Sequence, residues 1–71
     1  MSTQTAVKTA TVADFRRNLE DMRIPKGAKS MADYERTKRL LGTWLREVGQ
    51  HGMSTPSYES LIRVVADWVG V

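Results

Sequence analysis

The stretch SMADYERTKRLLGTWLREVG, residues 30–49, decides the fold because it carries the strongest helical pattern in the chain. Ser30 is a good N-cap, and Asp33 follows it at the spacing of a capping box. Gly49 comes just after the last apolar residue, where a left-handed residue commonly ends a helix. We therefore predict a helix over residues 31–48. The apolar residues that share its inner side are Tyr34, Leu41, Trp44, Leu45 and Val48, with Thr37 filling the turn between Tyr34 and Leu41.

A second helix is predicted upstream, over residues 12–23. Thr11 can cap it, and Asp14 stands where a capping box places its acidic partner. Proline at position 25 disfavours helical geometry in the residue before it, and Gly27 loosens the next turn, so the helix should end here. The residues that recur on one face are Val12, Phe15, Leu19 and Met22.

A third helix is predicted downstream, over residues 56–69. Thr55 can cap it, and Pro56 can take the first helical position, where its missing N–H costs nothing. The residues expected to face inward are Tyr58, Leu61, Ile62, Val65, Trp68 and Val69.

The fold class that follows is all-α, a small three-helix bundle formed by one domain over residues 11–71. Residues 1–10 are rich in Thr, Ser and Ala without apolar periodicity, so we expect a flexible, disordered N-terminal arm. The predicted core consists of Phe15, Leu19, Leu41, Trp44, Leu45, Leu61, Ile62, Val65 and Trp68.

Composition excludes several classes of protein. The 71 residues include no cysteine, so neither a disulfide framework nor a zinc–thiolate site is available. The first ten residues lack the apolar segment of a signal peptide. No run approaches the roughly 18 apolar residues of a membrane span. We expect a soluble cytoplasmic protein that makes no membrane contact.

Few residues in the sequence could act as catalytic groups. His51 is the only histidine, and the neighbouring carboxylates Asp33 with Glu35, and Glu20 with Asp21, point in different directions on a helix. The five glycines are scattered singly, so no phosphate-cradling loop exists. The expectation is a non-enzyme with no cofactor, no metal and no small-molecule substrate.

The segment GMSTPSYESLIRVV, residues 52–65, resembles the turn and recognition helix of helix-turn-helix transcriptional regulators, with the nearest likeness to GntR-type winged-helix repressors. The matching residues are Gly52, Met53, Ser54, Pro56, Ser57, Tyr58, Ile62 and Arg63. In that family the turn packs two helices together, and the residues that follow meet phosphates and base edges. The resemblance implies DNA contacts by Ser54, Thr55, Ser57, Ser60 and Arg63.

Two observations keep another interpretation of this segment open. Capping chemistry explains the residues from Ser54 to Ser57 equally well. From Pro56 to the end of the chain, Arg63 stands against Glu59 and Asp67, a net charge of −1. A helix that enters the groove of a polyanion normally carries positive charge.

Positive charge gathers elsewhere, between residues 23 and 39, within a chain of net charge +3. The functional interpretation is a basic patch that binds a phosphate backbone or an acidic protein surface; the alternative is an ordinary solvated face. Arg16 and Arg17 on the first helix could extend the patch. Its six members are Arg23, Lys26, Lys29, Arg36, Lys38 and Arg39.

The end of the chain is apolar on more than one face. Trp68 belongs first to the core and is also a candidate interface anchor. If three helices cannot cover all of this surface, the remainder predicts a homodimer or a protein partner. The residues concerned are Val64, Val65, Trp68, Val69 and Val71.

The sequence therefore supports two functions. The first is a small transcription regulator that binds double-stranded DNA, with the 54–63 segment in the major groove and the basic patch on the backbone. The second is a protein-binding regulator that docks on a larger host machine, such as RNA polymerase, and inhibits or redirects it, as small basic phage or mobile-element proteins do.

Overall fold

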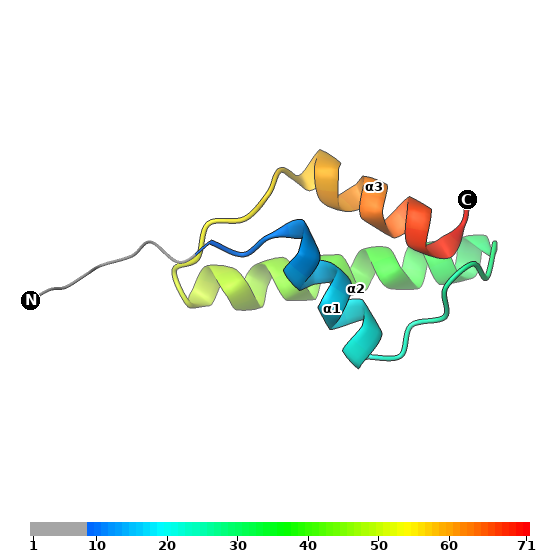
Figure 1. Ribbon diagram of the computed structural model, residues 1–71, viewed down its shortest axis with the longest axis horizontal. Helices are drawn as coiled ribbons and strands as arrows, with labels where there is room; N and C mark the ends of the chain where they lie inside the picture. Colours follow the sequence, from blue (N-terminus) through cyan, green and yellow to red (C-terminus); the bar gives the residue numbers. More distant parts are fainter. Residues whose placement is uncertain (1–8) are drawn as a thin grey trace, which may run out of the picture.

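The computed structural model describes residues 9–71, and within them the chain forms three α-helices and no strand of its own. They are α1 (Val12–Asp21), α2 (Met31–Gln50) and α3 (Tyr58–Val69). The chain reverses after α2, so α2 and α3 run in opposite directions, and α1 packs against α3 (Figure 1). The predicted all-α three-helix fold is confirmed.

The core lies where the three predicted apolar faces meet. Phe15 of α1 and Trp44 of α2 form a tilted aromatic pair with ring centroids 5.1 Å apart. Thr37 is also buried, and its hydroxyl donates to the Asp33 carbonyl at 2.7 Å, so it brings no unsatisfied polar group inside. Of the nine predicted core residues, Leu45 and Ile62 are only partly buried. The buried set is Phe15, Leu19, Leu41, Trp44, Leu61, Val65 and Trp68 from the prediction, together with Ala10, Val64 and Val69.

The capping box predicted for α1 is present in full. The Asp14 N–H donates to the Thr11 hydroxyl at 3.2 Å, and the Thr11 N–H donates to the Asp14 carboxylate at 2.9 Å. The helix ends at Asp21, two residues before the predicted end. The reason is Arg23, whose φ of 58° is left-handed and cannot continue a right-handed helix.

Helix α2 begins as predicted but runs two residues further, to Gln50. Ser30 accepts from the Asp33 N–H at 3.4 Å; the reciprocal half of the predicted capping box is not formed, and the Asp33 carboxylate lies 3.4 Å from Arg36 instead. The helix passes through Gly49, which was the predicted terminator. Gly52 supplies the left-handed turn, with φ 70°, and its N–H donates to the Gly49 carbonyl at 3.0 Å.

Helix α3 begins at Tyr58, so the prediction that Thr55 caps it and Pro56 opens it was wrong. Ser57 is the N-cap, because its hydroxyl accepts from the Ser60 N–H at 3.2 Å and lies 2.9 Å from the Ser60 hydroxyl. Tyr58 is the first residue of α3 and is 54% exposed, so the prediction that it faces inward was wrong.

The last two residues of the predicted N-terminal arm are packed on the domain. The Ala10 N–H donates to the Ser54 carbonyl at 2.8 Å, and Thr9 forms an isolated parallel bridge with Ser54. Ala10 is buried in the core cluster. The rest of the predicted arm, residues 1–8, lies outside the described residues.

Three helices do cover the apolar end of the chain. Val64, Val65, Trp68 and Val69 are all buried within the chain, and only Val71 is exposed. The homodimer therefore remains a prediction. The exposed apolar surface on which it was based is covered within the chain. Within residues 9–71, no helix combines the length and the apolar composition that crossing a membrane requires.

The capping box makes stability depend on pH. The Thr11 N–H, and then its hydroxyl, lower the pKa of Asp14 below its ordinary value, with a smaller contribution from Arg17. Because the folded-state pKa is the lower one, the stabilisation is present above about pH 4 and is lost as the pH falls through the folded-state pKa. In urea denaturation, the wild type and Asp14→Asn should differ less in their free energy of unfolding below about pH 4 than above it. A difference that stays constant across this range would contradict this role for the carboxylate.

Candidate functional site

The α1–α2 connection, residues 22–30, is the most positively charged segment of the described chain. It carries Arg23, Lys26 and Lys29 and no acidic residue, a net charge of +3. All three side chains belong to exposed residues, and none lies within ion-pair distance of a carboxylate among residues 9–71. We call this segment the cationic loop.

The cationic loop is held against the C-terminal end of α3 by backbone hydrogen bonds. The Gly27 N–H donates to the Trp68 carbonyl and the Lys29 N–H to the Val69 carbonyl, each at 2.7 Å. The last carbonyls of a helix have no partner within the helix, so the loop satisfies acceptors that would otherwise be left open. In Figure 1 the connection passes the end of α3 before it enters α2. The cations are therefore displayed from a fixed frame.

Trp68 fastens the other part of the loop. Its indole N–H donates to the Ile24 carbonyl at 3.1 Å, and the Lys26 ammonium lies 4.8 Å from the centroid of its ring. A cation over an indole face is attracted by the ring quadrupole. Trp68 itself is only 6% exposed. The structure thus places this candidate interface anchor inside the domain, where it anchors the loop.

Two of the three cationic residues in the loop have strained, left-handed backbone angles. Arg23 has φ 58° and Lys29 has φ 53°, in the left-handed region that glycine and asparagine adopt most easily. For other residues this conformation costs roughly 1–2 kcal/mol. Strain of this kind is enriched at functional sites. The positions that favour glycine on stability grounds carry charge instead.

The helical half of the predicted basic patch behaves differently from the loop half. Arg36 lies 3.4 Å from Asp33 and Lys38 lies 3.9 Å from Glu35. Exposed pairs of this type contribute only about 0–1 kcal/mol and can open when a stronger partner arrives. The six predicted residues therefore form two groups, three in the loop without ion pairs and three on α2.

Arg39 has no ion pair among the described residues and faces away from the core. It is two positions from both Thr37 and Leu41, which are buried, and so lies about 200° around the helix from each. It stands nine residues after Ser30, roughly 14 Å along the axis of α2. The side of α2 that faces away from the core, which carries Arg39, is therefore close enough to the cationic loop for one extended ligand to contact both.

The predicted recognition segment lies at the opposite end of α3 from the loop, a helix length of about 18 Å (Figure 1). Ser54 and Thr55 are exposed, and the Ser54 carbonyl accepts from Ala10. The hydroxyls of Ser57 and Ser60 are occupied in the N-cap, and Arg63 lies 4.0 Å from Glu59. The segment is accessible, but most of its side-chain groups already have partners.

The connection before α3 also differs from the usual turn of a helix-turn-helix. Seven residues separate Gln50 from Tyr58, against three or four in the motif. Helices α2 and α3 run side by side in opposite directions in Figure 1, whereas the two helices of the motif cross steeply. The geometry therefore gives more weight to the cationic loop than to the 54–63 segment.

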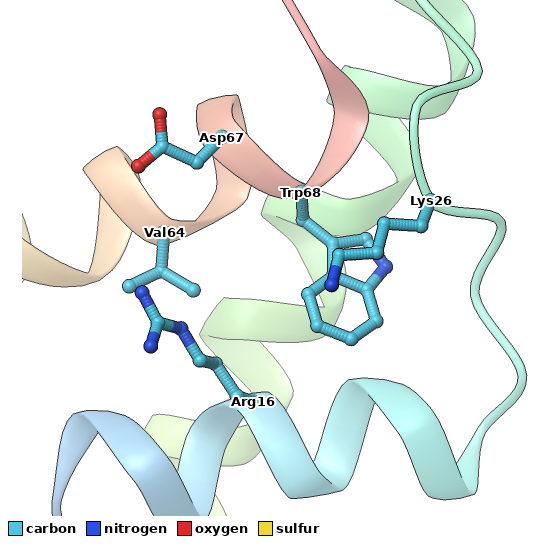
Figure 2. Close-up of a pocket in the computed structure, with 5 residues that line it drawn as sticks. All are labelled: Arg16, Lys26, Val64, Asp67 and Trp68. Atoms are coloured by element: carbon cyan, nitrogen blue, oxygen red, sulfur yellow. The ribbon is translucent and has the colours of Figure 1, made fainter.

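A hollow of about 310 Å³ opens between α1, the loop and α3 (Figure 2). Arg16 comes from α1, Lys26 from the cationic loop, and Val64, Asp67 and Trp68 from α3. The sequence did not predict this site, because its five residues come from three segments that only the fold brings together. We call it the α1–α3 hollow.

No three side chains of the types that ligate metals gather among residues 9–71 in a way that could hold an ion. His51 is exposed in the turn after α2. No family model, curated protein or solved structure matches the chain.

The indole hydrogen bond can be tested by Trp68→Phe, which keeps an aromatic ring but leaves the Ile24 carbonyl without its donor. Trp44→Phe is the matched control, because the structure gives the Trp44 indole no hydrogen bond within the described residues. We expect Trp68→Phe to lower the free energy of unfolding by about 1 kcal/mol more than the control. Equal losses in chemical denaturation would show that the hydrogen bond does not hold the loop.

The strained loop positions should respond to glycine in an unusual direction. Arg23→Gly and Lys29→Gly should each raise the free energy of unfolding by about 0.5–1 kcal/mol, because glycine relieves the left-handed strain. Ala28→Gly, at a neighbour without a left-handed backbone, should instead lower it. Chemical denaturation measures all three, and destabilisation by both charged-residue variants would contradict the strain.

Proposed function

We propose that this chain is a small non-enzymatic regulator that binds double-stranded DNA, with the cationic loop and the outer side of α2 on the phosphate backbone. The observation that carries the proposal is a loop of net charge +3 whose backbone is hydrogen-bonded to the end of α3, with two of its three cationic residues in a left-handed conformation. A loop whose backbone is already ordered loses little backbone freedom when its cations meet a row of phosphates.

The spacing of the cations suits a polyanion. Lys29 and Arg39 are separated by about 15 Å, taken along the axis of α2, with Arg36 between them. Successive phosphates of one DNA strand are a few ångströms apart, so several can be neutralised within this span. The Asp33 and Glu35 pairs do not prevent this, because Arg36 is exposed and Lys38 is partly exposed, so a phosphate can replace their carboxylate partners.

The 54–63 segment can then contribute in a secondary way. Its exposed hydroxyls at Ser54 and Thr55 lie at the far end of α3, where they can donate to a phosphate or a base edge. The exposed charges of α3 are Glu59, Arg63 and Asp67, a net of −1, so this helix adds no electrostatic attraction of its own. Under this proposal, most of the affinity for DNA does not depend on the base sequence of the duplex.

Fluorescence anisotropy with a labelled duplex of mixed sequence, measured over a range of salt concentrations, tests the proposal. The logarithm of the binding constant should fall linearly with the logarithm of salt concentration, by about 0.9 for each phosphate contact. Lys29→Gly and Arg39→Ala should each weaken binding to all duplexes alike and reduce this slope by about one.

Arg17→Gln is the matched control for these variants. The sequence allowed Arg17 to extend the basic patch, but the proposed DNA surface consists of the cationic loop and α2, and Arg17 lies on α1. Arg17 is exposed and lies two positions from both Phe15 and Leu19, on the side of α1 away from the core. Its loss changes the net charge by the same amount but should leave the slope nearly unchanged. Absence of duplex binding at low ionic strength, or an equal effect of the control, would refute the proposal.

A second function has one observation in its favour. The net negative charge on the exposed side of α3 suits a protein surface better than a nucleic acid. A regulator that docks on a larger protein machine would use this side of the molecule, which also borders the α1–α3 hollow.

A further inference from the structure

The α1–α3 hollow brings two cations together over an apolar surface. In Figure 2 the Arg16 side chain rises from α1 toward Val64, and Lys26 reaches in from the loop across the Trp68 ring. Val64 and Trp68 line the bottom of the hollow and are 5% and 6% exposed, so they form a small, well-packed apolar floor. Two positive charges that lie near one another beside an apolar surface repel each other, and an anion between them relieves this repulsion.

Neither cation has an acidic partner in the described part of the chain. Asp67 lines the same hollow, but it is within 4.0 Å of neither Arg16 nor Lys26, and its carboxylate points to the other side of α3 in Figure 2. Arg16 is therefore free to form the two parallel hydrogen bonds that a guanidinium makes with a carboxylate.

The size and the floor of the hollow select the kind of anion. A volume of about 310 Å³ is near the lower limit of ligand sites, so it accepts a small group and not a duplex. The Val64 and Trp68 floor favours an apolar body next to the charge. A carboxylate is small enough for this volume and can contact both cations.

We propose that the α1–α3 hollow binds a short acidic segment of a protein partner, with a glutamate or aspartate carboxylate between Arg16 and Lys26. An aromatic or large aliphatic neighbour of that residue would lie on Val64 and Trp68. This inference does not depend on DNA binding, and it gives the second function a site.

Titration of the isotope-labelled protein with acetyl-Phe-Glu-amide, followed by two-dimensional NMR, tests the proposal. The indole N–H of Trp68 is the reporter, because it is fixed on Ile24 beneath the site. We expect a saturable shift of this signal. Binding should weaken roughly fivefold to tenfold for acetyl-Phe-Gln-amide, which lacks the charge, and for acetyl-Gly-Glu-amide, which lacks the ring.

Two variants separate this site from the DNA surface. Arg16→Gln, at an exposed position, should weaken peptide binding by a similar factor, whereas the neighbouring Arg17→Gln should leave it unchanged. Lys29→Gly should weaken duplex binding and leave peptide binding intact. The proposal is overturned if no saturable shift appears, if the charged and uncharged peptides bind equally, or if Arg16→Gln and Arg17→Gln have equal effects.

Discussion

The architecture depends on how the α1–α2 connection closes the C-terminal end of α3. Two loop N–H groups satisfy the Trp68 and Val69 carbonyls, and the Trp68 indole returns a hydrogen bond to Ile24. These contacts join residues forty or more positions apart, and a domain of this size has few such long-range contacts to spare. They fix the exit of α1 and the entry of α2 together. The contacts that hold the fold together therefore also position the loop backbone that carries the three cations.

Much of the fold could be predicted from periodicity and capping, because both are local. Apolar spacing predicts most of the inner face of each helix; Met22 and Tyr58, which it also placed inward, are exposed. The Thr11 and Ser30 caps follow from side chains that reach their own first turn. The errors occurred where two local signals competed. Thr55-Pro56 and Ser57 both offer a start for α3, and Ser57 prevails because the Ser60 N–H and hydroxyl are both within its reach. Gly49 and Gly52 both offer an end for α2.

The candidate sites could be predicted only in part. A run of cations is visible in the sequence. Which of them have a left-handed backbone (Arg23 and Lys29) and which form ion pairs (Arg36 and Lys38) depends on backbone angles and on position around α2. The packing of Ala10 beside Ser54 and the position of Lys26 over Trp68 have no local signal. The hollow between Arg16 and Lys26 arises from the packing of α1 against α3, which no short motif encodes.

Exchange of the loop amides with solvent deuterium, measured in the free protein, tests the central claim most directly. The N–H groups of Gly27 and Lys29 donate to α3, so their opening should require the same free energy as the amides of Leu61 and Val65 within that helix. If they open together with the core, the cations are held before any partner arrives. Exchange of both amides at the rate of an unstructured chain, with α3 still protected, would contradict the account.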